Sequence, residues 1–285
     1  MSIDSGQEEL PRQVAGRPEM RESDLEYGRR TKEIIDNVLR DQFGDFFRSQ
    51  EVLDGREAIP CIYKEGDPDS RVVLVLGDNA SGKSYFRRLV EYTVQIGRLT
   101  ELARIPDGKY PSDIFEVSPE ERMEPGSFAA LRYGDEAMHS TGDSSLQMVS
   151  RTIGWIRDAA QKKPTRDCIA YFDEPDMGSG LRVAKSIGLL IGSLGAERIP
   201  QLKSIFVTSH NPAVVRQLLK ADSRPHYVFL GDSEGPRTIE DWLEMQKSEE
   251  VDPISPEELK KLSRQRFSDI QKVLDLRKER RKKTK

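Results

Sequence analysis

The most regular feature of the chain is a set of short, almost continuous apolar runs separated by longer amphipathic stretches. Three runs have the length of a strand and consist almost wholly of aliphatic and aromatic residues: residues 71–76 (RVVLVL), 168–172 (CIAYF) and 204–208 (SIFVT). A weaker run covers residues 227–230 (YVFL). Such runs are typical of strands buried on both faces, as in a parallel sheet that is covered by helices.

Amphipathic helical periodicity fills the segments between these runs. The predicted helices are residues 83–96, 145–161, 181–194 and 212–221. Strands that alternate with helices predict an α/β fold with a mostly parallel sheet flanked by helices. Residues 52–53 and 58–63 predict a small antiparallel element near the N-terminus, and residues 129–133 a short strand within the proline-containing segment 99–136.

The two ends of the chain differ from this α/β core. Residues 1–28 are polar without apolar periodicity, which predicts a disordered segment, whereas residues 29–48 read as an amphipathic helix. We therefore expect one domain over residues 29–245. Residues 246–285 are highly charged, with a helix predicted at residues 256–276 and a final RKERRKKTK tail.

Composition narrows the function classes. The 285 residues include 45 Lys and Arg against 49 Asp and Glu, a net charge of −4, and no apolar run reaches the roughly 18 residues of a membrane-spanning helix. The polar N-terminus does not resemble a secretory signal. Two cysteines, Cys61 and Cys168, and three histidines are too few for a disulfide scaffold or a Cys- or His-rich metal site. A cytoplasmic protein without membrane insertion is expected.

A phosphate-binding loop stands between the first long apolar run and the helix that follows it. The complete motif G-x-x-x-x-G-K-[ST] is formed by Gly77, Asp78, Asn79, Ala80, Ser81, Gly82, Lys83 and Ser84. Glycines at both ends let the backbone N–H groups converge on a phosphate, and the helix directs its positive end at the same anion. Lys83 is then expected to bind the β and γ oxygens, and the Ser84 hydroxyl to ligate Mg²⁺.

Three further motifs follow in order along the chain. Asp173 and Glu174 end the second long apolar run, where one carboxylate orients Mg²⁺ and the other accepts a proton from water; an ordinary acidic turn is the alternative. His210 follows the third run and suits a γ-phosphate contact, although a capping or core histidine is the simpler interpretation of this residue alone. A turn formed by residues 140–143 (STGD) precedes a predicted helix, either as a second anion site or as a simple N-cap.

Together these four motifs resemble the ABC-type P-loop ATPases, in particular compact non-transporter members similar to RecF, SMC and OLD-like proteins and small bacterial "AAA domain" ATPases. The resemblance covers about residues 71–230. It implies ATP as the nucleotide and assigns Asp173 to Mg²⁺, Glu174 to the general base and His210 to the switch histidine. It implies that Ser140, Thr141 and Gly142 correspond to the signature motif, which closes over ATP held by a second subunit. An ATP-dependent head-to-tail homodimer is implied, which would act on a DNA-related or effector partner.

The pattern departs from this family in two places. The signature reads STGD, and no glutamine occurs in residues 99–136 to serve as a Q-loop. Only 55 residues separate Ser84 from Ser140, too few for a long coiled-coil rod. An adenine-stacking role for Tyr63 competes with simple packing of a strand tyrosine.

Three alternative functions stay open. The chain could be the ATPase subunit of a membrane transporter, a P-loop kinase of a small molecule that uses Arg87 or Arg88, or an ATP-dependent binding module with little turnover. The basic tail, residues 277–285, carries seven basic residues against one acidic, which suits nucleic-acid phosphates or a solvated helix end.

Overall fold

The apolar runs form the strands of one six-stranded sheet in a computed structural model of the chain. The structure describes residues 61–77, 81–102, 111, 113–119, 141–162, 166–222, 224–231, 235–247 and 255–283. The strands are β1 (Cys61–Lys64), β2 (Val72–Leu76), β3 (Asp113–Val117), β4 (Cys168–Asp173), β5 (Leu202–Thr208) and β6 (His226–Leu230). The helices are α3 (Lys83–Leu102), α6 (Thr141–Lys162), α7 (Leu181–Ala196), α8 (Pro212–Ala221), α9 (Ile239–Met245) and α10 (Pro256–Lys283).

The sheet is mixed, with the strand order β1-β6-β2-β5-β4-β3. Five strands run parallel, and the edge strand β1 pairs antiparallel with β6. The expected α/β architecture with a mostly parallel sheet is therefore confirmed, together with an antiparallel element at its N-terminal edge. One consequence matters for the site: β5 lies between β2 and β4, so the carboxyl ends of these three strands are neighbours.

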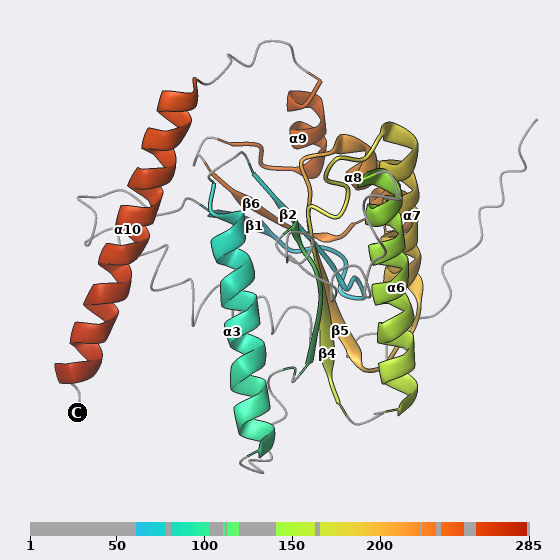
Figure 1. Ribbon diagram of the computed structural model, residues 1–285, viewed down its shortest axis with the longest axis horizontal. Coiled ribbons are helices and arrows are strands. Elements are labelled where there is room, and N and C mark those ends of the chain that lie inside the picture. Colours follow the sequence, from blue (N-terminus) through green and yellow to red (C-terminus); the bar gives the residue numbers. More distant parts are fainter. Residues whose placement is uncertain are drawn as a thin grey trace, which may run out of the picture.

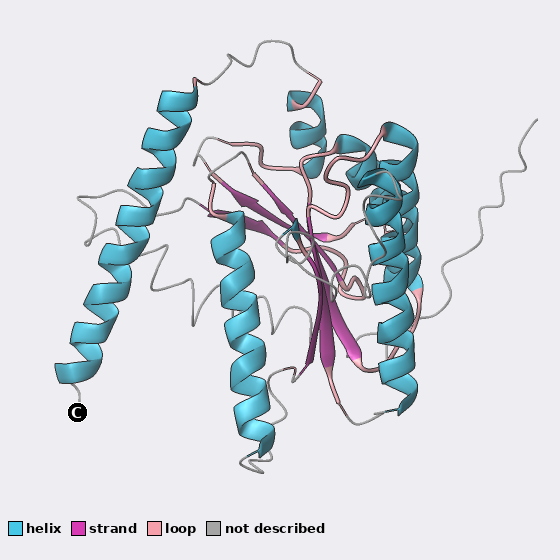
Figure 2. Cartoon of the chain, viewed as in Figure 1, coloured by secondary structure: helices cyan, strands magenta, loops and turns pink. Residues whose placement is uncertain are grey.

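The connections place helices on both faces of the sheet. The chain crosses from β2 to β3 in one direction and returns from β3 through β4 and β5 to β6 in the other. Because crossovers between parallel strands are right-handed, α3 must cover one face and α6, α7 and α8 the opposite face. Figure 1 shows this arrangement, and Figure 2 shows the strands as a single layer between the helices.

Both faces of the sheet are packed. Under α3, the buried rings of Phe86, Phe206 and Tyr171 follow one another with centroid separations of 6.0 and 5.7 Å. On the other face, aliphatic residues of β2, β4 and β5 pack against α6, α7 and α8. The continuous apolar runs are explained by this double burial, since every residue of β2, β4 and β6 is buried.

Several expected elements differ from the structure. The segment 99–136 contains β3 at Asp113–Val117, which the pattern did not predict, and α9 was also missed. The C-terminal helix does not end at residue 276 but continues to Lys283, so most of the basic tail is helical. The predictions for residues 1–60 and for a strand at residues 129–133 lie outside the described residues.

Helix α9 follows from local chemistry. Thr238 accepts a hydrogen bond from the backbone N–H of Asp241, and the Asp241 side chain accepts one from the N–H of Thr238 in return. This capping box starts the helix, and Trp242, only 1% exposed, anchors it to the core. Among the residues the structure describes, no helix is long and apolar enough to cross a membrane.

Candidate functional site

The loop from β2 to α3 has the backbone that its glycines allow. Gly77 and Gly82 have φ angles of +152° and +105°, which side-chain-bearing residues rarely adopt. A Cβ at Gly77 would lie 2.1 Å from the Leu230 carbonyl oxygen, so the backbone at the start of this loop lies in close contact with the end of β6. Asp78, Asn79 and Ala80 lie outside the described residues.

Two buried polar groups face into this loop at the start of α3. Lys83 is 7% exposed, and its Nζ donates a hydrogen bond to the Gly77 carbonyl at 2.8 Å. Ser81 is 4% exposed, and its Oγ has no hydrogen-bond partner among the described residues. An orphaned buried hydroxyl, a buried ammonium and the N-terminus of a 20-residue helix fit an anion. Ser84 is exposed in the first turn, where its hydroxyl is accessible to a metal ion.

Two carboxylates stand at the end of β4. Asp173 closes the strand and is 7% exposed; burial raises the pKa of its carboxyl, against a hydrogen bond from Thr208 and the charge of Arg87. Glu174 follows with φ at +44°, a strained value for a residue other than glycine. Its backbone N–H donates to the Thr208 carbonyl at 3.0 Å, which ties the turn to β5. Strain of this kind clusters at functional sites because it directs a side chain.

His210 meets Glu174 from the neighbouring loop. Its Nε2 lies 3.2 Å from the Glu174 Oε1. The His210 imidazole is the main influence that lowers the pKa of Glu174, with help from the charge of Lys83 and against the effect of burial. The structure therefore brings together Lys83, Asp173, Glu174 and His210, which lie up to 127 residues apart in the sequence.

A pair of residues that sequence reasoning did not single out joins the loops after β4 and β5. The Ser209 Oγ donates to the Asp176 Oδ1 at 3.0 Å and accepts from the backbone N–H of Asn211 at 2.9 Å. Asn211 in turn caps α8 by accepting from the N–H of Ala213. Asp176 and Ser209 are both buried, so this link fixes the position of the His210 loop.

The STGD segment is helical, which corrects the expected turn. Helix α6 begins at Thr141 rather than at residue 145, and Gly142 lies in its first turn; Ser140 is outside the described residues. The start of α6 packs on the segment after β4: the Ser145 Oγ donates to the Met177 carbonyl at 3.3 Å, and a Cβ at Gly142 would stand 3.8 Å from the Ser179 Cα. Because α6 and α3 cover opposite faces, this segment and the phosphate loop stand on different sides of the sheet (Figure 1).

A buried arginine on α3 contacts the Asp173 carboxylate. Arg87 is 4% exposed, and its Nη1 lies 3.1 Å from the Glu116 Oε1 and 3.4 Å from the Asp173 Oδ2. Its Nε lies 3.2 Å from Glu91. These contacts engage Arg87 inside the protein, whereas its neighbour Arg88 is exposed. The sequence places Arg87 one helical turn after Lys83 on α3, but it does not identify the carboxylates that Arg87 meets.

Packing explains Tyr63, the candidate for adenine stacking, and also the buried cysteine Cys168. The Tyr63 hydroxyl lies 3.1 Å from the His226 Nδ1, and the two rings stack, so Tyr63 is held against β6. Cys168 is buried at the start of β4, where burial raises the pKa of its thiol to about 12. Its thiolate population near neutral pH is therefore very small.

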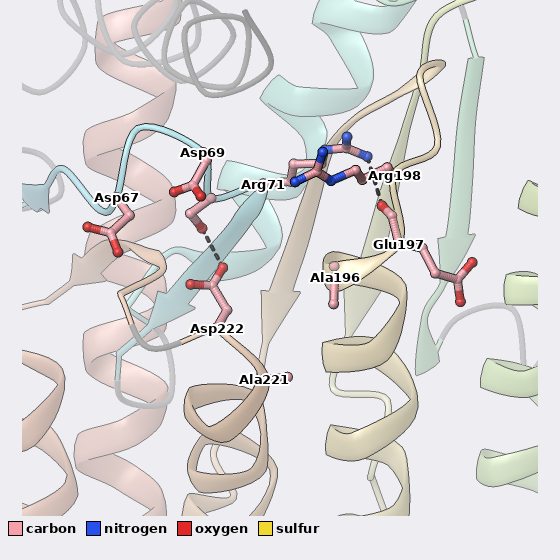
Figure 3. A pocket seen from close by; sticks show the side chains of 10 residues that line it. Asp67, Asp69, Arg71, Ala196, Glu197, Arg198, Ala221 and Asp222 are labelled. Carbon is pink, nitrogen blue, oxygen red and sulfur yellow. Dashed lines mark hydrogen bonds between the residues drawn. The ribbon is translucent and has the colours of Figure 1, made fainter. Parts of the chain in front are cut away.

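The described cavities lie at the amino edge of the sheet, away from the phosphate loop. One of about 250 Å³ lies before β2, between the ends of α7 and α8. Asp69 and Asp222 line one side of it and Arg71 and Arg198 the other (Figure 3). The Asp222 Oδ2 accepts a hydrogen bond from Ser70, and Arg71 donates to the Glu197 carbonyl at 3.1 Å. A second cavity of about 280 Å³ lies beside Cys168.

A pre-formed metal cage is absent from the described part of the chain, where no group of three or more His, Cys, Asp or Glu side chains could hold an ion. Mg²⁺ in nucleotide sites uses one or two protein ligands plus phosphate oxygens and water, so Ser84 and Asp173 suffice as donors. No protein-family model matches the chain, and a search of curated proteins returned no match.

Proposed function

We propose that the protein is an Mg²⁺-dependent ATPase of the ABC type with a P-loop fold. The single observation that carries this proposal is the convergence of Lys83, Asp173, Glu174 and His210 beside a glycine-bounded loop at the start of α3. A lysine for phosphate oxygens, a carboxylate for the metal, a base and a γ-phosphate contact are the groups that ATP hydrolysis requires.

The strand order supports the same proposal. Because β5 separates β2 from β4, the loop carrying His210 emerges between the phosphate loop and the two carboxylates. Ligands in open α/β sheets bind at the carboxyl ends of strands, and all four groups are found there. Bound Mg²⁺ would neutralise charge between the β- and γ-phosphates.

Glu174 has the properties of a general base for an attacking water. The carboxylate is ionised near neutral pH, as a proton acceptor must be, and the contact with His210 that lowers its pKa also fixes its position. His210 orients this carboxylate and is itself placed to donate a hydrogen bond to a phosphate oxygen. Small-molecule kinase chemistry has less support, since Arg87 is already paired inside the protein and cannot serve as a lid arginine.

The starts of helices α3 and α6 lie on opposite faces of the sheet, and this arrangement supports the ATP-dependent homodimer. Lys83 begins α3 and Thr141 begins α6 on different faces of the sheet, so the sheet lies between the start of α6 and the chain's own phosphate loop. A second copy in head-to-tail orientation would bring its α6 to that loop, and the γ-phosphate would join the two subunits. An effector protein or nucleic acid would then respond to the dimer.

The solution mass of Glu174→Gln with and without Mg-ATP tests this function. We expect light scattering to give 32.4 kDa without nucleotide and twice that value with Mg-ATP, because the variant binds ATP without consuming it. Turnover should fall by about 10²- to 10⁴-fold, the usual contribution of a general base. Lys83→Ala, which removes the phosphate contact, is the matched control and should stay monomeric.

The outcomes separate the parts of the proposal. Equal ATP turnover in Glu174→Gln and the wild type would refute the general base. A monomer that binds ATP would refute the homodimer and leave the start of α6 as a structural helix end. A wild-type protein that neither binds nor hydrolyses Mg-ATP would refute the function as a whole.

A further inference from the structure

Helix α3 carries two buried cations on one face. Arg87 follows Lys83 by four residues, so their side chains project from the same side of the helix, one turn apart. The Lys83 Nζ points back to the Gly77 carbonyl of the phosphate loop. Arg87 instead extends to β3 and β4, at the far side of the sheet from β6. The two cations therefore meet different partners, one a nucleotide loop and the other protein carboxylates.

The carboxylates that meet Arg87 come from adjacent strands. Glu116 of β3 is in register with Tyr171 of β4, and Asp173 follows Tyr171 by two residues. Side chains in register, and those two residues apart on a strand, point to the same face. Glu116 and Asp173 consequently both project under α3, and the Arg87 Nη1 lies within 3.4 Å of an oxygen of each.

Asp173 is held from two sides. Arg87 contacts its Oδ2, and Thr208, the last residue of β5, donates a hydrogen bond to the same carboxyl group. Lys83 is the other cation whose charge acts on Asp173. Because these groups are buried, their ion pairs are weakly screened, and loss of Arg87 would leave Lys83 as the cation that acts on the Asp173 charge.

We propose that Arg87 is a positioning residue that sets the Mg²⁺ dependence of nucleotide binding, an inference that rests on the proposed ATPase function. By holding the Asp173 Oδ2, Arg87 keeps this carboxylate from pairing with Lys83. Lys83 then keeps its place at the phosphate loop, where it donates to the Gly77 carbonyl, and Asp173 stays available as a metal ligand together with Ser84. Glu116 completes the arrangement by fixing the guanidinium from the edge strand β3.

A merely structural ion network makes a different prediction. It would lower the stability of the fold when Arg87 is changed and leave the metal dependence of nucleotide binding as it is. The measured quantity must therefore be the Mg²⁺ concentration that half-saturates nucleotide binding, and not activity alone.

The test compares Arg87→Gln with Arg88→Gln in the full chain. Both variants remove one positive charge from the same turn of α3, but Arg88 is exposed and Arg87 is buried. Calorimetric titration with ATPγS at graded Mg²⁺ gives the half-saturating concentration for each. We expect Arg87→Gln to need about 10- to 100-fold more Mg²⁺, the range found when the support of a metal ligand is removed, and Arg88→Gln to match the wild type.

Arg87→Lys keeps the charge and protects the test against misfolding. It retains a cation near Asp173 but loses the separate Nε group that contacts Glu91 and helps to fix the guanidinium, so an increase smaller than that of Arg87→Gln is expected. If Arg87→Gln does not fold, the increase in Arg87→Lys supports the proposal, and a wild-type Mg²⁺ requirement in Arg87→Lys overturns it.

The remaining outcomes are distinct. A wild-type protein that binds Mg-ATPγS, together with equal Mg²⁺ requirements in Arg87→Gln and Arg88→Gln, overturns the role of Arg87 alone. A reduced requirement in Arg87→Gln also overturns it, since Arg87 would then oppose the metal. Failure of the wild type and of Arg88→Gln to bind the nucleotide at any Mg²⁺ concentration overturns the proposed function and this inference together.

Discussion

Helices α7 and α8 pack so closely that a single methyl group should separate them. Gly188 of α7 faces α8, and a Cβ at this position would lie 2.7 Å from the Val214 carbonyl oxygen and 2.9 Å from the Gln217 Cβ. The carbonyl oxygen belongs to the backbone of α8 and cannot rotate away. Gly188→Ala must therefore move one helix relative to the other, and these helices begin directly after the loops that carry Glu174 and His210.

The magnitude follows from two opposing effects. Replacing glycine by alanine inside a helix stabilises it by about 0.5–1 kcal/mol, whereas overpacking a tight contact costs about 1–3 kcal/mol. Gly154, on the exposed side of α6, is the matched control, because a Cβ there meets nothing within 4 Å. Gly154→Ala should therefore be stabilised by the full effect of replacing glycine with alanine inside a helix, about 0.5–1 kcal/mol. Gly188→Ala should lose about 1–2 kcal/mol, the balance of the two effects.

Urea unfolding followed by circular dichroism measures both variants under the same conditions. The midpoint should rise for Gly154→Ala and fall for Gly188→Ala, with unchanged slopes, because one methyl group hardly changes the surface that unfolding exposes. Equal upward shifts of the two midpoints would refute the reasoning. They would mean that α7 and α8 separate without cost, and that this interface does not fix the loops at the head of each helix.

Two further predictions concern Asp222 and the basic C-terminal segment, which lie outside the candidate nucleotide site. Burial raises the pKa of Asp222, and the charges of Asp69 and Asp67 add to this effect. From about pH 4 upward the native state therefore binds more protons than the unfolded state, and the protein loses stability as the pH rises. The urea midpoint of Asp222→Asn should therefore rise relative to that of the wild type as the pH increases from 3.5 to 7. A difference between the two midpoints that does not change with pH would contradict this. Removal of residues 277–285 should leave ATP binding unchanged and weaken any affinity for DNA at low salt; unchanged DNA binding would leave this basic segment as a solvated helix end.

The strands of the sheet core could be predicted from the sequence because burial on both faces favours apolar residues at nearly every position. β2, β4 and β5 appear as apolar runs for that reason. The edge strand β3 has only its last residue buried and carries Asp113 and Glu116, so its pattern resembled a charged loop. The C-terminal helix was placed correctly at its start, but its end depends on a run of Lys and Arg with good helix propensity, which carries no apolar signal.

The candidate site was predictable where the chemistry is local. A phosphate loop is a contiguous motif, and Asp173, Glu174 and His210 each follow an apolar run. The contact of Arg87 with Glu116 and Asp173 depends on which strands are neighbours and on which face each residue points to. No sequence pattern contains that information, because it arises only when β3 takes its place beside β4.

The same geometry links the two faces of the sheet through the loops at its carboxyl edge. Ser209, next to His210, bonds to Asp176, and the Met177 carbonyl accepts from Ser145 of α6. A displacement of the His210 loop therefore acts on the loop after β4 and through it on the start of α6. In the proposed ATPase, His210 senses the γ-phosphate on one side of the chain, and the start of α6 meets a second copy on the other. Two hydrogen-bonded routes would join these events: one runs from Ser209 to Asp176, and the other from His210 to Glu174, whose carbonyl accepts a hydrogen bond from the Met177 N–H.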